Sequence, residues 1–229
     1  MKISIIIPVF NEEKYILKVL KNVNFFKKEL NLEIIVSDDG SNDDTLSLLK
    51  KNEDLYDTLV EGKENKGKGS AIINALKFIN GDYVIIQDAD LEYNPEDYFK
   101  LIDPINKFGA EVIFGSRFKG SDAKRILYFK NRVANFILSF MVSLLTNINF
   151  SDVETGYKVI KSNIFKELNL KENSFAIEIE MVMKLAKKNL KFYEVGISYN
   201  GRTFEDGKKI KTMDGLIALY KIFYYKFKK

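Results

Sequence analysis

Short apolar runs alternate with longer amphipathic segments over the first half of the chain. The runs are rich in Ile and Val, and polar residues or glycine follow them, which is typical of buried strands. They occupy residues 2–7, 33–37, 58–61, 83–87 and 111–114, and the segments at residues 11–30, 43–51, 68–79 and 95–108 have helical spacing. Strands that alternate with helices predict an α/β sandwich around a mostly parallel sheet.

The alternation ends near residue 120. Beyond it we expect one long helix or two short ones over residues 125–150, a helix over 172–189, a strand over 192–199 and a terminal helix over 211–227. This second half is expected to cover a site formed by the first half and to receive a second substrate.

Polar and acidic residues gather where the predicted strands end. Ligands of open α/β sheets bind outside the carboxyl ends of the strands, and here those ends carry residues 8–12, 38–41, 88–90 and 115–117. Asp88 and Asp90 follow a buried strand and are one residue apart, so both carboxylates can face one point. Two such ligands suit Mg²⁺ or Mn²⁺ when a bound diphosphate completes the shell. The alternative is a solvated turn or a capping pair before Pro95.

A glycine-rich segment over residues 62–69 resembles a phosphate-binding loop. Gly69 stands where a serine or threonine would bind magnesium, and the segment follows the third strand, so we reject an ATPase. We expect close approach of the backbone to a nucleotide, with Lys68 near phosphate at a helix start. A flexible turn is the alternative.

The composition excludes several kinds of chemistry. The 229 residues include no cysteine, histidine or tryptophan, so disulfides, thiol nucleophiles, Ser-His-Asp triads and imidazole metal ligands are excluded. An enzyme of this composition works with carboxylates, lysines, arginines, hydroxyls and backbone amides, and binds metal through oxygen. We expect one folded domain without a signal peptide or membrane span, and the lack of cysteine is compatible with the cytoplasm.

The net charge of +4 is unevenly distributed. Residues 117–132 carry six Lys and Arg against one Asp, and residues 202–229 carry eight against three acidic residues. The first stretch includes Lys124, Arg125 and Lys130. Two basic stretches on an otherwise acidic chain indicate an anionic partner: nucleic acid, phosphate groups or an anionic membrane surface.

Two apolar segments adjoin these basic stretches. Within residues 133–145, Asn135, Ser139 and Ser143 recur every fourth residue and form one narrow polar face. The segment is too short for the about 20 residues that span a bilayer, so it is either a core helix or a helix in the membrane plane. Residues 219–229 mix aromatics with lysines, which favours a membrane-surface anchor. We expect no nucleic-acid partner, since no recognised reader motif accompanies this tail.

Taken in order, the motifs resemble those of inverting family-two glycosyltransferases with a GT-A fold, in the polyprenyl-phosphate branch typified by dolichol-phosphate mannose synthase. The resemblance runs from residue 2 to about 212 and rests on residues 7–12 (IPVFNE), 38–41 (DDGS), 67–69 (GKG), 88–90 (DAD), 115–117 (GSR), 152–158 (DVETGYK) and 200–202 (NGR). It implies one GT-A domain, a three-layer sandwich with C-terminal acceptor-side helices. Residues 1–118 would bind the nucleotide sugar, residues 119–212 the acceptor, and residues 213–229 would form a basic amphipathic helix.

The resemblance also implies roles for residues on the donor side. Pro8, Phe10 and Glu12 would line the pocket for base and ribose, and Asp38 and Asp39 would read the base. Asp88, Ala89 and Asp90 would bracket the metal and diphosphate, and Glu92 stands where the family often has a glutamine near the metal.

On the acceptor side, the resemblance implies that Arg117 and Arg132 receive a phosphate. Arg202 would steady the phosphates, helped by Lys208 or Lys209, and Asp152 lies in an acidic motif. The chain departs from the family in the segment Gly207-Lys208-Lys209, which lacks the usual serine, and in Ser37, which replaces a usual valine. The long hydrophobic C-terminal spans of some relatives are missing, so any membrane contact is expected to be peripheral.

Three functions are compatible with these residues. The first is metal-dependent, inverting transfer of a hexose from a nucleotide-diphosphate sugar, with uridine preferred by family habit, to a polyprenyl phosphate at the cytoplasmic membrane face. Such a phosphate is already ionised, so no strong general base is needed. The second is transfer to a hydroxyl acceptor in surface polysaccharide synthesis, where a carboxylate such as Asp152 would accept the proton. The third is a non-catalytic nucleotide-sugar binding module.

Overall fold

A seven-stranded sheet forms the centre of the protein in a computed structural model that describes residues 1–120, 125, 128–202 and 212–228. Its strands are β1 (Ile3–Val9), β2 (Leu32–Asp38), β3 (Thr58–Glu61), β4 (Tyr83–Ile86), β5 (Val112–Ser116), β6 (Lys158–Lys161) and β7 (Phe192–Gly196). They lie in the order β3-β2-β1-β4-β6-β5-β7. Every neighbouring pair is parallel except the two that involve β6. The predicted mostly parallel sheet is confirmed, but β6 was not predicted.

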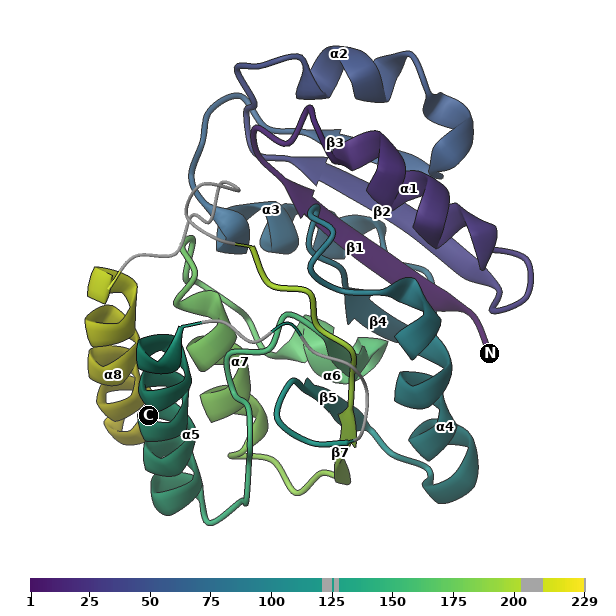
Figure 1. The fold of residues 1–229 in the computed structure, drawn as a ribbon. Coiled ribbons are helices and arrows are strands. Elements are labelled where there is room, and N and C mark those ends of the chain that lie inside the picture. Colours follow the sequence, from purple (N-terminus) through teal and green to yellow (C-terminus); the bar gives the residue numbers. More distant parts are fainter. Residues whose placement is uncertain (121–124, 126–127, 203–211, 229) are drawn as a thin grey trace.

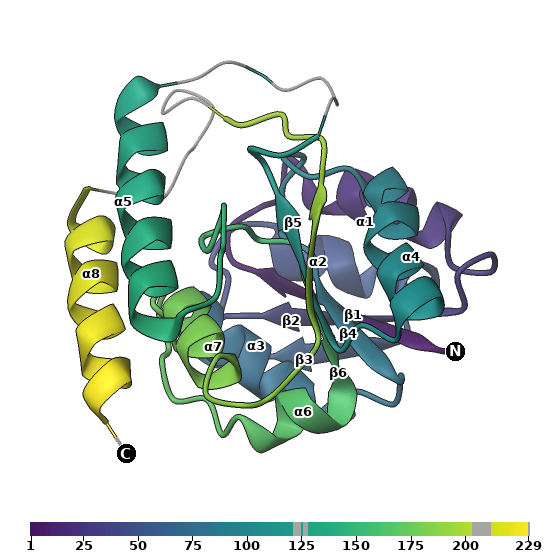
Figure 2. The same ribbon diagram turned by 90° about the horizontal axis from the view of Figure 1, so that it is seen from below.

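Helices cover both faces of the sheet. They are α1 (Ile16–Phe25), α2 (Thr45–Lys50), α3 (Lys68–Ala75), α4 (Tyr98–Phe108), α5 (Phe129–Thr146), α6 (Ser162–Glu167), α7 (Ile177–Leu185) and α8 (Thr212–Phe227), with single 3-10 turns at Glu53–Leu55, Leu76–Phe78 and Pro95–Asp97. Helices α1, α2 and α4 share one core with the sheet, and α3, α6 and α7 share the other. Helix α8 packs against α5 and α7, at the margin of the molecule (Figures 1 and 2). The result is a three-layer sandwich with an added helix pair.

The apolar run of strand β1 is unbroken because the strand is buried on both faces. Ile5 and Ile7 enter the core beneath α1, whereas Ile6 enters the core on the opposite face. A strand buried on both faces needs apolar residues at consecutive positions. Because β1, β2, β4 and β5 run in the same direction, their carboxyl ends lie along one edge of the sheet. The residues that follow these ends are therefore brought together there.

Left-handed residues lie near the boundaries of several helices. Asn11 has a φ of +50°, and helix α1 begins five residues later, at Ile16, so it starts later than predicted. Helix α5 ends before the predicted residue 150, at a left-handed Asn147 with a φ of 58°, and α4 ends as predicted, before Gly109 with a φ of 63°. Asparagine and glycine tolerate this conformation, and such residues commonly end helices.

Helix α5 has its polar face turned inward. Asn135 and Ser139 are buried, whereas Phe136 is 67% exposed and Phe140 is 55% exposed. Helix α8 likewise exposes apolar side chains, among them Met213, Leu216, Ile217, Tyr220 and Phe223. Neighbouring exposed apolar faces of this kind mark a surface that meets a partner or a membrane. Among the helices of the described residues, none combines the length and apolarity that crossing a membrane requires.

Candidate functional site

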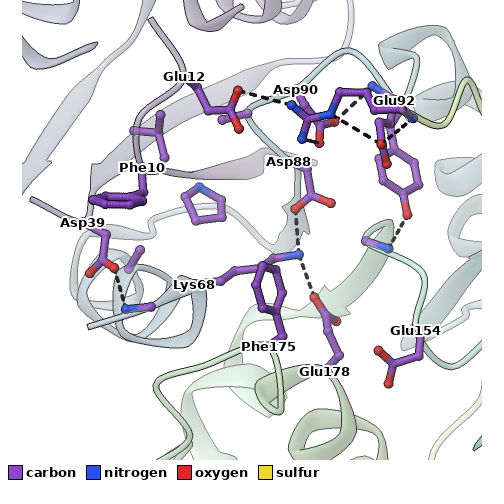
Figure 3. Close-up of a pocket in the computed structure, with 18 of the residues that line it drawn as sticks. Phe10, Glu12, Asp39, Lys68, Asp88, Asp90, Glu92, Glu154, Phe175 and Glu178 are labelled. Atoms are coloured by element: carbon purple, nitrogen blue, oxygen red, sulfur yellow. Dashed lines mark hydrogen bonds and ion pairs between the residues drawn. The ribbon is translucent and has the colours of Figure 1, made fainter. Parts of the chain in front are cut away.

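A cavity of about 540 Å³ opens at the edge of the sheet where the parallel strands end (Figure 3). Most of the residues expected to bind the donor or the phosphates line it, namely Pro8, Phe10, Glu12, Asp39, Lys68, Asp88, Ala89, Asp90, Glu92, Arg117 and Arg202. Three expected residues, Asp38, Asp152 and Arg132, lie outside its lining. Residues from six different parts of the sequence thus converge on one cavity.

Phe10 and Asp39 lie at one side of the cavity (Figure 3). The carboxylate of Asp39 accepts hydrogen bonds from the backbone N–H groups of Lys66 at 3.0 Å and Gly67 at 2.5 Å. The carboxylate of Asp38 is buried and accepts from the N–H groups of Gly40 and Ser41, so it supports the turn after β2. Asp39 is therefore placed to face a ligand, whereas Asp38 is placed to hold the chain.

The glycine-rich segment before α3 approaches another part of the chain. A Cβ atom on Gly69 would lie 2.0 Å from the carbonyl oxygen of Glu172, and one on Gly67 would lie 2.6 Å from that of Asn173. The N–H of Ser70 donates to the same Asn173 oxygen at 3.1 Å. These two glycines are needed to bring α3 against the segment before α7. Asn65, Gly67 and Lys68 of this segment line the cavity, so its predicted approach to a nucleotide stays a prediction.

Lys68 joins two acidic residues in the middle of the cavity (Figure 3). Its Nζ atom lies 2.6 Å from Asp88 and 2.8 Å from Glu178. Burial opposes the charge of Lys68, but the two carboxylates outweigh it and raise its pKa. The second oxygen of Glu178 binds the fully buried Lys158 at 2.5 Å, and Lys158 also donates to the carbonyl of Thr155. Glu178 is thus held between two lysines.

Arg202 gathers a second set of acidic residues at the edge of the cavity. Its guanidinium lies 2.7 Å from Asp90, 3.4 Å from Glu92 and 3.5 Å from Glu12. Burial raises the pKa of Asp90 to about 7, and the charges of Asp88 and Glu92 add to this effect while Arg202 opposes it. The donor side of the cavity therefore concentrates negative charge that attracts cations.

Asp88 and Asp90 have the oxygen donors that Mg²⁺ and Mn²⁺ prefer. The third expected ligand, Glu92, is engaged elsewhere, because it accepts from the Tyr199 hydroxyl and from the Arg202 N–H, both at 2.7 Å. Within the part of the chain that the structure describes, no three acidic side chains are close enough together to hold a metal ion. The residues fit a metal held by the two aspartates and by oxygens of a bound diphosphate.

Arg117 and Asp152 form a buried ion pair beside the cavity. Asp152 is 0% exposed, and its two oxygens accept from the Arg117 side chain at 2.7 and 2.8 Å. Burial opposes the charge of Arg117, but Asp152 outweighs it and raises the pKa of the guanidinium. Asp152 faces Arg117 and lies outside the cavity lining. Both carboxylate oxygens of Asp152 are thus occupied by Arg117.

Arg132 lies on the exposed surface of α5, beyond Phe118. The Phe118 ring centre is 6.0 Å from the Arg132 guanidinium carbon and 5.8 Å from that of Arg117. Arg132 lines a separate hollow of about 350 Å³, together with Phe136 and Phe140. The two arginines thus flank one aromatic ring, with Arg117 at the cavity and Arg132 outside it. Lys124, Lys208 and Lys209 lie outside the described residues.

Five acidic or aromatic residues of the cavity lining had no predicted role, namely Tyr93, Glu154, Phe175, Glu178 and Tyr199. Glu178 carries a signal that could have identified it, because it lies in the apolar run of residues 175–183. A carboxylate in such a run is either buried with a partner or functional. The tyrosines carry no such signal, since buried tyrosines are common in protein cores.

Comparison with known proteins adds to this picture. Residues 4–168 match the profile of glycosyl transferase family 2. The chain is 29% identical over 217 residues to a dolichol-phosphate mannosyltransferase of Pyrococcus furiosus, a match that covers 92% of this chain and 61% of that protein. It is 28% identical over 241 residues to a UDP-N-acetylglucosamine–dolichyl-phosphate N-acetylglucosaminyltransferase of Methanococcus voltae, covering 97% and 93%.

The same fold occurs in a solved structure of low sequence identity. Glucosyl-3-phosphoglycerate synthase from Mycobacterium tuberculosis, crystallised with Mn²⁺, UDP and phosphoglyceric acid, superposes with a TM-score of 0.75 at 17% identity. The match covers 100% of this chain and 79% of that one.

Proposed function

The chain belongs to glycosyl transferase family 2, and on that premise we propose that it transfers a hexose, with inversion, from a UDP-linked donor to a polyprenyl phosphate at the cytoplasmic face of a membrane. It is a glycosyltransferase with the GT-A fold. Since a glycosyltransferase is an enzyme, the third function, a non-catalytic nucleotide-sugar binding module, is excluded. The observation that carries the proposal is one cavity lined by an aspartate pair, a lysine and two arginines.

The donor would lie across the cavity from Phe10 to Asp88. Phe10 offers an aromatic face for the base, and Asp39 offers a carboxylate beside it. Asp88 and Asp90 would hold Mg²⁺ or Mn²⁺, which would supply positive charge to the leaving diphosphate. Lys68 forms an ion pair with Asp88 and Arg202 forms one with Asp90, so both would add positive charge near the phosphates. Two proteins support a UDP-linked donor. One is a relative named for a UDP-linked sugar, and the other is a structural neighbour crystallised with UDP.

The acceptor would enter from the side of Arg117. Arg117 lines the cavity, and Arg132, outside the cavity, contacts the same Phe118 ring, so the two would make a cationic path for a phosphate. Two relatives are named for dolichol-phosphate acceptors. A phosphate needs no strong base at neutral pH. Transfer to a hydroxyl is less well supported, because both oxygens of Asp152 are bound to Arg117.

The exposed apolar faces of α5 and α8 would rest on the membrane that holds this acceptor. Phe136, Phe140 and Leu144 of α5 are exposed, and Arg132 lies at the start of the same helix. A helix that buries an apolar face in the lipid boundary and has basic residues near it binds anionic membranes. This arrangement would place the mouth of the acceptor path beside the lipid head groups.

Replacing both Phe136 and Phe140 by serine is expected to weaken binding to anionic vesicles by at least about tenfold, because two exposed phenyl groups no longer enter the lipid. Sedimentation with phosphatidylglycerol vesicles measures this. The matched control is the pair Phe25→Ser and Phe78→Ser, which are also exposed but belong to α1 and to the 3-10 turn after α3. Equal binding by both double variants and the original protein would contradict the membrane assignment.

The donor assignment predicts selective stabilisation by nucleotide sugars. A UDP-linked sugar with Mn²⁺ or Mg²⁺ is expected to raise the melting midpoint by several degrees, because a ligand that binds the folded state stabilises it. A panel of UDP-, GDP- and ADP-linked sugars, each with metal or with EDTA, makes the comparison. Stabilisation by a GDP-linked sugar alone would overturn the choice of uridine, and stabilisation unaffected by EDTA would overturn the metal.

A further inference from the structure

Glu154 stands apart from the other acidic residues of the cavity. It lies between α5 and β6 and lines the cavity. Its Oε1 atom is shielded from solvent and has no hydrogen-bond partner among the described residues. Each of the remaining acidic residues in the lining has a partner in the protein, namely Glu12, Asp39, Asp88, Asp90, Glu92 and Glu178. Buried polar atoms almost always have a partner. Because Glu154 lines the cavity and no described residue binds this oxygen, rotation of the side chain can present it to a ligand.

The chain holds Glu154 rigidly on both sides. The preceding residue, Val153, is fully buried, and its N–H donates to Ser139 at 3.1 Å. Two residues further on, the N–H of Gly156 donates to the Tyr93 hydroxyl at 2.8 Å. Asp152, before these, is fixed by Arg117. These contacts fix the backbone on either side of Glu154, which leaves only its side-chain torsions free.

Glu154 lies at the end of the cavity that would hold the transferred sugar. Phe10 and Asp39 occupy one side, Lys68 and Asp88 the middle, and Glu178 and Glu154 the other side (Figure 3). If the base stacks on Phe10 and the diphosphate lies near Asp88, the sugar would lie beyond Asp88, on the side where Glu154 is found. This order rests on the proposed function, because it takes the direction of the donor from it.

Glu154 also differs in charge from its neighbour Glu178. Glu178 is bound by Lys68 at 2.8 Å and by Lys158 at 2.5 Å, so its oxygens are occupied and its charge is neutralised. No ion pair joins Glu154 to another described residue, and burial raises the pKa of its carboxyl to about 7 against the opposing charge of Lys158. In its ionised form this carboxyl accepts hydrogen bonds from O–H and N–H groups and repels a second carboxylate.

We infer that Glu154 determines sugar specificity by accepting a hydrogen bond from a hydroxyl or amide N–H of the transferred sugar. The substrate class that follows is a neutral hexose or an N-acetylated hexosamine. Hexuronic acids are rejected, because their carboxylate would lie against an unpaired carboxyl group. A polar group left without its partner on the wrong ligand is a strong source of selectivity.

The variant Glu154→Gln tests this inference with little change of shape. We expect it to raise KM for the preferred neutral UDP-sugar about tenfold with a smaller change in kcat, and to leave the affinity for UDP alone unchanged. Relative use of UDP-glucuronic acid should rise. The matched control is Glu167→Gln, an exposed glutamate on α6 paired with Lys188, which should change none of these values.

Three results would overturn the inference. The first is an unchanged ratio of neutral to uronic sugar use in Glu154→Gln, and the second is a weakened affinity for UDP alone, which indicates a structural role. The third is a large fall in kcat at constant KM with loss of a pH-dependent limb, which indicates a general base. If the original protein neither binds nor turns over any nucleotide sugar, the proposed function itself fails. These outcomes are therefore distinguishable.

Discussion

Replacing Asp88 by asparagine is expected to lower kcat/KM for sugar transfer by roughly two to three orders of magnitude. Asp88 lies in the middle of the cavity, with one oxygen 2.6 Å from the Lys68 ammonium. The substitution keeps the size of the side chain but removes its charge. The metal would then lose one of its two protein ligands, and Lys68 would lose one of the two carboxylates that hold it beside the leaving diphosphate.

The same variant should fold normally, because Lys68 keeps its second partner, Glu178, at 2.8 Å. Steady-state transfer rates and the melting midpoint separate the two effects. Asp103→Asn is the matched control, since Asp103 is half-exposed on α4 and pairs with Lys107. Retention of more than a tenth of the activity by Asp88→Asn would contradict the role given to this carboxylate.

Replacing Arg117 by methionine is expected to damage both stability and transfer. Asp152 is 0% exposed and bound by the Arg117 side chain through both oxygens, so the variant leaves a buried charge without its cationic partner, held only by the N–H of residue 117 at 3.0 Å. Breaking a buried pair in this way costs about 3–5 kcal/mol of unfolding free energy. Transfer should fall at least about a hundredfold, because the acceptor phosphate loses the cationic group that lines the cavity.

A second substitution separates these two effects. Adding Asp152→Asn to Arg117→Met removes the unpaired charge and should restore much of the stability, measured by chemical denaturation, but none of the transfer. Arg132→Met removes an exposed cation and should raise KM for the lipid acceptor alone. Recovery of transfer in the double variant would contradict a direct role of Arg117. Because Asp152 and Arg117 form one unit, comparing their single variants cannot distinguish a phosphate acceptor from a hydroxyl acceptor.

The fold was largely predictable because six of its seven strands are short apolar or β-rich runs, and four of them, β1, β2, β4 and β5, are buried throughout. The acidic strand ends identify the edge at which the cavity lies. Strand β6 was missed because it begins and ends with lysine, and a fully buried Lys158 contradicts the expected pattern. The partner that makes this burial possible, Glu178, lies 20 residues further along the chain.

The contacts that build the site could not be predicted from sequence spacing. The ion pairs of Arg117 with Asp152 and of Lys68 with Glu178 join residues far apart in the chain. Their formation depends on the sheet order, which places β6 between β4 and β5. Helix α5 illustrates the same limit. Its spacing reveals a polar stripe, but only the tertiary packing decides that Asn135 and Ser139 face inward.

The most direct test of the account is the identity of the product. The protein is incubated with a radiolabelled UDP-sugar, Mn²⁺ and polyprenyl phosphate in phosphatidylglycerol vesicles, and label extracted into organic solvent is counted before and after mild acid. We predict acid-labile label in the lipid fraction that requires the polyprenyl phosphate and is lost in Asp88→Asn. Transfer of label to a soluble hydroxyl acceptor, with none in the lipid fraction, would contradict the account.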